Sequence, residues 1–250
     1  MTEEHITSRK NPLLLHAKKL LSSRSYRYQC GEFAADGTKL LEEAAKWYSG
    51  LTTVIAQENL RLCALPETVR VVRVPEDVMK SVSLMEAPQG AVFLCRMPRK
   101  CEPAVQPGSL LLDGIQDPGN LGTILRTADA LQVPVILLDG CADAYNPKTV
   151  RASMGAVFRT QPQTMPTEQA AEVFRRAGIP LLAAAMGEDA KDLRQRDCAH
   201  AAIVVGSEGQ GVCPALLQGA DGKIVIPMQP NCESLNAATA AAIIMWQMKQ

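Results

Sequence analysis

The stretch LLLDGIQDPGNLGTILR, Leu110 to Arg126, indicates how the second half of this chain folds. Its apolar start, Leu110 to Leu112, predicts a short buried strand, and the Asp, Pro, Gly and Asn residues that follow predict a turn. Apolar residues then recur at helical spacing, so we expect a helix that begins near Asn120, with Asn120 as its N-cap. Arg126 would lie on the second turn of that helix, facing the cleft that the Gly-rich turn borders. An ordinary strand–loop–helix joint with a solvated Arg126 is the alternative.

Further short apolar runs follow this stretch, and each ends in turn residues. This pattern is typical of a mostly parallel sheet with both faces covered, so the fold class is α/β. Ligands of such sheets bind beyond the carboxyl ends of the strands. The expected strands after the first are 135–138, 181–185, 202–205 and 223–226.

The first hundred residues predict a separate, smaller α/β domain, because short β-rich runs alternate with helical stretches. The MPRKCEPAVQPG segment, 97–108, contains three prolines and reads as a linker, which gives domains of 1–104 and 105–250. We expect helices over 7–23 and 37–48, a polar loop over 22–32, strands at 52–56, 69–74 and 91–95, and helical stretches around Glu58 and Asp77.

Composition indicates a soluble globular protein: the chain has 250 residues, of which 47% are hydrophobic and 21% charged. No apolar run approaches the roughly 18 residues that a membrane span needs, and the first ten residues lack the apolar core of a signal peptide. The eight cysteines are scattered, without a C-x-x-C pair. Their spacing argues against a metal site or a disulfide framework, and favours a cytoplasmic location.

The formal net charge is zero, but the charge is uneven. Residues 1–104 contain 15 Lys and Arg against 12 Asp and Glu, whereas residues 105–250 contain 11 against 14. A locally basic end can track the phosphates of a nucleic acid, and cations mixed with tyrosines over 24–28 suit stacking on exposed bases. A solvated helix face is the alternative. The candidate contacts are Arg9, Lys10, Lys18, Lys19, Arg24 and Arg27.

Two more loops carry candidate chemistry. AAIVVGSEGQG, 201–211, is a buried strand followed by three glycines, but its G-x-x-G-x-G spacing is neither the dinucleotide fingerprint nor a P-loop. Glycines still let a backbone approach a ligand closely. The third loop leads from Ile226 through Ser234 and Asn236 into an Ala-rich helix, which either polar residue would cap.

Taken together, these loops resemble the three motifs of the SpoU (TrmH-type) family of RNA ribose 2′-O-methyltransferases, in the SPOUT superfamily. The matching stretches are DPGNLGTILRTADA, IVVGSEGQGV and IVIPM…ESLNAATAAAI, in the family's order. YNPKTVRASMGAVFR, 145–159, is also similar to a family segment, and the N-terminal stretch resembles the small substrate-binding domain of many members. Asp36 stands where members often have Glu, a departure that bears on local packing.

The resemblance implies a trefoil knot near the C-terminus, a homodimer, and S-adenosylmethionine bound by the knot loops near the dimer interface, with residues of both subunits contributing. Cofactor contacts would come from Gly206, Ile226, Leu235 and, on the adenine side, Ala184.

The reaction that the resemblance implies is methyl transfer to a ribose 2′-hydroxyl, which only RNA offers. Arg126 would stabilise the negative charge that grows on the oxygen, since guanidinium rarely deprotonates in proteins. Glu208 is the alternative base, or else it holds Arg126 or Asn120 in place. Asn120, Ser234 and Asn236 would orient these groups and the ribose.

Two other functions compete with this one. A non-catalytic RNA-binding protein of the same fold is disfavoured because all five candidate catalytic residues are intact. A nucleotide-dependent oxidoreductase, or another small-molecule enzyme on a parallel sheet, is disfavoured because the dinucleotide fingerprint and its acidic ribose partner are absent. Within the family, ribosomal RNA is the preferred target by analogy with the two-domain layout, and transfer RNA is the alternative.

Overall fold

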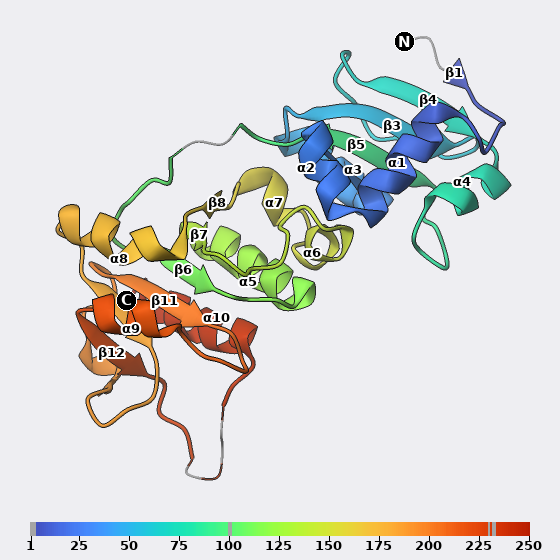
Figure 1. Cartoon of the computed structure of the whole chain (residues 1–250). Helices are drawn as coiled ribbons and strands as arrows, with labels where there is room; N and C mark the ends of the chain where they lie inside the picture. The colour runs from blue at the N-terminus through green and yellow to red at the C-terminus, as the bar shows by residue number, and fades with distance from the viewer. Residues whose placement is uncertain (1–3, 100–101, 230, 232–233) are drawn as a thin grey trace. The chain divides into compact units, whose positions relative to one another are not determined.

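The computed structural model describes residues 4–99, 102–229, 231 and 234–250. The chain divides into two compact units (Figure 1), one of 1–99 with 145–159 and the other of 100–144 with 160–250. Each unit has its own sheet. The segment 145–159 clusters with the first unit although it lies far along the sequence. The predicted domains 1–104 and 105–250, with their linker, stay a prediction.

The first unit contains, in its described part, a five-stranded mixed sheet of order β1-β4-β3-β5-β2. β1, β4 and β3 run parallel, whereas β5 is antiparallel to both β3 and β2. The strands are β1 (Glu4–His5), β2 (Glu32–Asp36), β3 (Leu51–Gln57), β4 (Arg70–Val74) and β5 (Ala91–Arg96). The helices are α1 (Pro12–Ser22), α2 (Arg24–Cys30), α3 (Thr38–Trp47), α4 (Glu76–Val82), α6 (Pro147–Ala152) and α7 (Ala156–Arg159).

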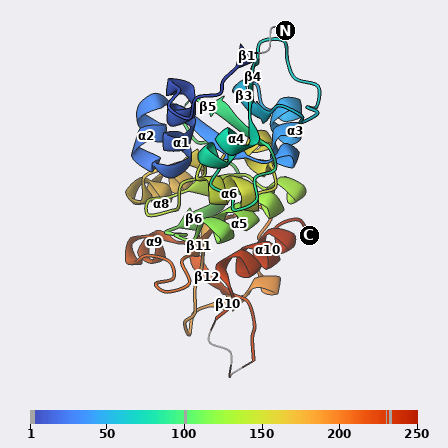
Figure 2. The ribbon, with the colours of Figure 1, turned by 90° about the vertical axis from the view of Figure 1, so that its right-hand side faces the viewer.

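The strands of this unit alternate their side chains between two cores. Ala34 and Leu94 belong to the cluster beneath α1 and α4. Phe33 and Phe93 point to the opposite face, where both rings contact Phe158 of α7. Figure 2 accordingly shows α1 and α3 on opposite sides of the sheet.

Three predictions for this unit need correction. α1 begins at Pro12 rather than Thr7, because Asn11 caps it and Pro12 takes a first-turn position. The stretch 22–32 is not a loop: most of it forms α2, whose first turn is capped by the Ser23 side chain and whose end is Gly31 in the left-handed conformation. No helix forms around Glu58 either, since β3 ends in a turn there.

The second unit contains, among its described residues, a seven-stranded sheet that is parallel throughout, of order β10-β12-β9-β11-β6-β7-β8. The predicted α/β class is therefore confirmed. The strands are β6 (Leu110–Asp113), β7 (Val135–Leu137), β8 (Gln163–Thr164), β9 (Leu181–Ala184), β10 (Lys191–Asp192), β11 (Ala202–Gly206) and β12 (Gly222–Val225). The helices are α5 (Pro118–Leu131), α8 (Thr167–Arg176), the 3₁₀ turn η1 (Leu193–Gln195), α9 (Pro214–Gly219) and α10 (Ala237–Gln247).

Helices cover both faces of this parallel sheet, as its continuous apolar strands require. Figure 2 shows α9 and α10 on opposite sides of β11 and β12. Phe174 of α8 and Leu216 of α9 fill one core with Val204 of β11. On the other face α10 packs along α5, and Ala241 of α10 is fully buried. The trefoil knot stays a prediction, since strand order and register do not define threading.

No helix in the described part of the chain is long and apolar enough to cross a membrane.

Candidate active site

The three predicted loops meet because their strands are neighbours in register. Gly206, the last residue of β11, pairs with Asp113, the last residue of β6. On its other side, β11 pairs Val205 with Ala184 of β9, and Ala184 pairs with Ile224 of β12. Parallel strands end at one edge, so the segments that follow all four strands emerge side by side.

A cavity of about 420 Å³ opens at this edge, a size typical of small-molecule sites. Its walls are mostly aliphatic, with a few polar groups from the 206–212 loop and from Ser234. All four residues predicted to contact the cofactor lie on these walls: Ala184, Gly206, Ile226 and Leu235. Of the five predicted catalytic residues, Glu208 and Ser234 line the cavity.

Glu208 joins the three loops through one carboxylate oxygen. Its Oε1 accepts hydrogen bonds from Asn120 Nδ2 at 3.0 Å, Asn236 Nδ2 at 2.7 Å and the Ala237 backbone N–H at 3.0 Å. Asn236 Nδ2 also donates to Asn120 Oδ1 at 3.0 Å. Hydrogen bonds to an ionised acceptor are stronger than neutral ones, so this junction fixes the loops against one another.

Asn120 Oδ1 is available to accept from Asn236 because Asn120 is not the N-cap of α5. The helix begins at Pro118, and the Asp117 side chain is the cap, accepting from the Asn120 backbone N–H at 2.8 Å. The prediction that Asn120 caps the helix was therefore wrong. At the other end of the junction, Asn236 caps α10, accepting from the Ala238 and Thr239 backbone N–H groups, so its side chain serves cap and junction at once.

Sequence reasoning missed Asp113, a second carboxylate that ties loops together. Asp113 is 7% exposed, and its Oδ2 accepts from the Cys213 backbone N–H at 2.7 Å. This bond anchors the far end of the 206–213 loop to β6. The signal was present in the sequence, since a carboxylate directly after a buried apolar strand needs a partner.

Arg126 lies on the exposed side of α5, on its third turn rather than the predicted second, because the N-cap is Asp117, three residues before Asn120. The structure does not bring it to the cavity: Arg126 is absent from the cavity walls and makes no hydrogen bond or ion pair with the described residues. Six helical positions from Asn120 correspond to about 240° of rotation, so the two side chains leave α5 in different directions.

Residues 108–246 match the model of the SpoU rRNA methylase family, more than half of the chain. The chain belongs to the SpoU family. A second model, the MRM3-like substrate binding domain, matches residues 11–92. The chain is 32% identical over 248 residues to the 23S rRNA (guanosine(2553)-2′-O)-methyltransferase RlmP of Bacillus subtilis, covering 98% of this chain and 99% of that protein.

Solved structures of the SpoU family share the fold over nearly the whole chain. A putative RNA methyltransferase of the TrmH family from Porphyromonas gingivalis is 35% identical, with a TM-score of 0.87, covering 96% of this chain and 98% of that one. The SpoU methyltransferase AviRb from Streptomyces viridochromogenes, solved with AdoMet, is 28% identical, with a TM-score of 0.83 and coverage of 96% and 97%.

The cavity suits an S-adenosylmethionine-sized ligand, as expected for a SpoU protein. Gly206 lacks room for any side chain, because a Cβ there would overlap the backbone of Gly211 and Val212. The two arms of the 206–212 loop therefore touch, and they leave the cavity wall to backbone and aliphatic groups. Apolar walls with few polar atoms match an adenine ring and the aliphatic part of a methionine chain.

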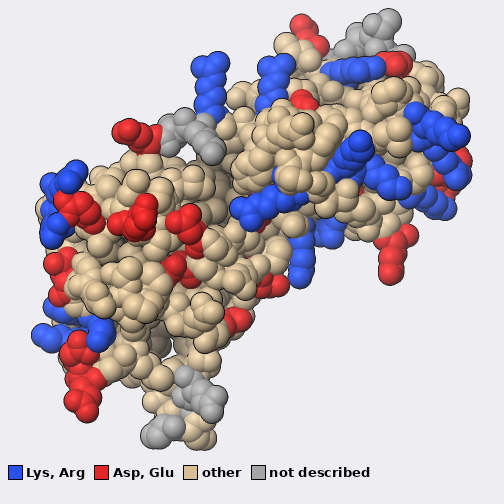
Figure 3. Space-filling view, in the orientation of Figure 1, with Lys and Arg blue, Asp and Glu red and all other residues tan. Residues whose placement is uncertain are grey.

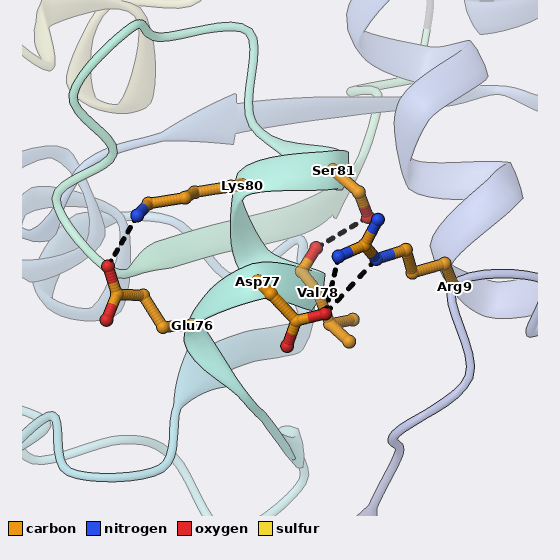
Figure 4. A network of polar contacts seen from close by, with 6 residues as sticks. All are labelled: Arg9, Glu76, Asp77, Val78, Lys80 and Ser81. Carbon is orange, nitrogen blue, oxygen red and sulfur yellow. Dashed lines mark hydrogen bonds and ion pairs between the residues drawn. The ribbon is translucent and has the colours of Figure 1, made fainter.

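The basic face of the first unit is only partly available to a SpoU substrate. Lys and Arg side chains gather on this unit (Figure 3), and Lys10, Lys18, Lys19 and Arg24 are exposed. Arg9 is already paired, because its Nη2 lies 2.6 Å from Asp77 Oδ2 (Figure 4). Both members of that pair are more than half exposed, so the bond is weak and exchangeable.

Arg27 does not fit its predicted role as an RNA contact. It is 2% exposed, and its Nη1 donates to the Leu20 backbone carbonyl at 2.7 Å, which joins α2 to α1. Its neighbours Arg24 and Tyr28 do reach solvent, with the guanidinium 5.7 Å from the ring centroid. Arg24 and Tyr28 therefore still offer the exposed cation and aromatic ring that the sequence predicted for contact with RNA bases.

Proposed function

We propose that this protein transfers the methyl group of S-adenosylmethionine to a ribose 2′-hydroxyl in RNA, with ribosomal RNA as the substrate. The observation that carries the proposal is the Glu208 junction beside the 420 Å³ cavity, which unites all three family motifs in one site. The likeness over the whole chain to a 23S rRNA methyltransferase supports ribosomal RNA.

In this proposal the cavity binds the cofactor, which supplies an electrophilic methyl group on sulfonium. Gly206, Ile226 and Leu235, which line the cavity, would hold it, largely through backbone groups, and Ala184 would line the adenine side. Glu208 acts as a positioning residue, since three N–H donors already occupy its Oε1. Ser234, which lines the cavity, orients the ribose together with Asn120 and Asn236.

Arg126 stabilises the developing negative charge on the attacking oxygen, and the hydroxyl proton passes to water or an RNA phosphate. A guanidinium does not serve as the base, because it does not give up its proton in proteins. Since Arg126 does not line the cavity of its own chain, we place it at the cavity of a partner subunit in a homodimer.

α10 supports such a homodimer. Its sequence, AATAAAIIMWQ, is apolar all round, which is typical of a helix covered on every side. Yet Trp246 is 61% exposed and Ile243 is 39% exposed, one turn apart on the face that α5 leaves open. A second copy of the chain would cover them.

Replacing both Trp246 and Ile243 with Lys should split the dimer, because a buried interface Trp typically contributes about 2 kcal/mol or more. We expect the dissociation constant to rise at least about thirtyfold, measured by light scattering across a dilution series. Trp47→Lys is the matched control, since Trp47 is 52% exposed on α3 and should leave the dimer intact. A wild-type monomer at micromolar concentration would contradict the proposed assembly.

Lys18 and Lys19, adjacent and exposed on α1, are our leading candidates for RNA phosphate contacts. The double charge reversal to Glu should weaken RNA binding and lower the slope of log affinity against log salt by about 1.4. Arg175→Glu with Arg176→Glu on α8 changes the net charge equally and should leave the slope unchanged. If filter binding gives the two double variants the same RNA affinity and the same salt dependence, the basic residues of α1 do not contact RNA and form a solvated helix face.

The experiment that tests the function is to map 2′-O-methylated nucleotides in total RNA from cells with and without this protein. One ribosomal position should lose its methyl group, and the purified protein should restore it in vitro with S-adenosylmethionine. Loss in transfer RNA instead would correct the substrate, and no change in any RNA would overturn the proposal.

A cytoplasmic location fits the described cysteines, which are free thiols.

A further inference from the structure

A second cavity, of about 370 Å³, lies within the first unit. Its walls come from the end of β2, from α3, from residues 85 and 89, and from the 145–159 segment. That segment packs against Glu43 of α3. A Cβ at Gly155, where φ is +86°, would lie 2.8 Å from the Glu43 Cβ, and Arg159 pairs with the Glu43 carboxylate. The cavity therefore has one wall built from a distant part of the chain.

Asp36, on the wall of this cavity, has a carboxylate oxygen without a partner. The residue is 4% exposed; the Ser83 hydroxyl donates to Oδ2, and Oδ1 accepts from no described residue. Burial raises the pKa of the carboxyl, against the opposing effects of the Ser83 hydroxyl, the Arg151 charge and the Leu84 backbone N–H. A buried acceptor without a donor costs free energy, so a ligand that brings an N–H would relieve it.

The other residues that line the cavity indicate which further groups such a ligand would carry. Lys39 and Arg151 are exposed cations that suit a negative group. Of the two other carboxylates on these walls, Glu43 is paired with Arg159 and Glu42 is exposed to solvent. Met85 and Met154 offer thioethers that suit a flat ring. Met154 is 46% exposed although apolar, and it holds the left-handed conformation at φ +49°, which side chains rarely adopt. Such strain concentrates at functional sites, because elsewhere it would relax.

We propose that this cavity binds one unpaired nucleotide of the RNA substrate, with a guanine N–H donating to Asp36 Oδ1, the ring between Met85 and Met154, and the phosphate near Lys39 and Arg151. Guanine fits best because its N1–H and amino group are adjacent donors, whereas the single imino N–H of uracil lies between two carbonyl oxygens. The site would select substrate, separately from the ribose that receives the methyl group. This inference rests on the proposed function for its RNA ligand.

The test is calorimetry on the full-length protein with GMP, UMP and guanosine, with excess S-adenosylmethionine present to occupy the other cavity. GMP should bind at least about tenfold more tightly than UMP, and Asp36→Asn should abolish that preference. Lys39→Gln should weaken GMP but not guanosine. The matched control is Glu76→Gln, the same isosteric loss of charge on an exposed carboxylate of α4, which should change neither nucleotide.

Equal binding of GMP and UMP to the wild-type protein would overturn the inference, and this comparison needs no variant that has to fold. Unchanged GMP binding by a folded Asp36→Asn protein would overturn it too. Methyl transfer is measured separately. If the protein methylates RNA but shows no preference for GMP, only this inference is contradicted. If it binds GMP through Asp36 but transfers no methyl group, only the proposed function is contradicted.

Discussion

Arg126→Ala should lower methyl transfer to RNA by at least about 10²–10³-fold while cofactor affinity stays within about twofold of wild type, the loss expected when one group that stabilises transition-state charge is removed. Cofactor affinity should survive because the cavity walls are formed without Arg126, which in the proposed homodimer faces the attacking ribose oxygen rather than the cofactor. The fold should survive as well, since the side chain is exposed and bonds to no described residue.

Single-turnover transfer and cofactor calorimetry separate these two effects. Arg126→Lys is the informative companion variant, because it keeps the charge and loses the planar fork that binds phosphate through two N–H groups. We expect its rate to fall between those of wild type and Arg126→Ala. Transfer by Arg126→Ala within threefold of wild type would remove Arg126 from the mechanism and make Glu208 the leading candidate.

Most strands of the second unit could be predicted from the sequence, because buried parallel strands consist of short apolar runs. Leu110–Leu112 and 202–205 were predicted as strands, and they form the adjacent strands β6 and β11. The order of the strands was not predictable in the same way. Pairing between β11 and β6 joins residues about ninety positions apart, and no local pattern specifies such a partner.

The helix boundaries that were predicted wrongly are those where neighbouring residues could each act as a cap. Asp117 and Asn120 are both good N-caps, and Pro118 decides between them by taking the first helical position. Ser23 and Gly31 similarly mark the two ends of α2, but the seven residues between them lack an apolar stripe. In both helices the capping residues themselves indicate where the helix begins or ends.

Burial of individual charged residues could not be predicted, because it depends on tertiary contacts. Arg27 looks like its neighbour Arg24 in the sequence, yet only Arg27 turns inward to the Leu20 carbonyl. Asp36 is likewise buried by Ser83 from the end of α4. The convergence of the cofactor residues on one cavity was expected from the family resemblance rather than from periodicity.

Gly206→Ala should abolish cofactor binding, lowering affinity at least about a hundredfold. The added Cβ would overlap backbone atoms of Gly211 and Val212, which cannot swing aside as a flexible side chain does. The 206–212 loop would have to open, and it forms one wall of the cavity. Calorimetry with S-adenosylmethionine measures the loss. Gly209→Ala is the matched control in the same loop, since nothing lies within 4 Å of its Cβ position.

This variant also tests whether Arg126 serves the partner subunit. Dimers mixed from Arg126→Ala and Gly206→Ala chains contain one intact cavity, on the first chain, and one intact Arg126, on the second. If Arg126 acts across the interface, those two meet in a working site, and random mixing should restore about a quarter of wild-type activity. If it acts within its own chain, every site in the mixture lacks one component and activity stays at the level of the separate variants. That second outcome would require α5 to move so that Arg126 reaches the cavity of its own chain.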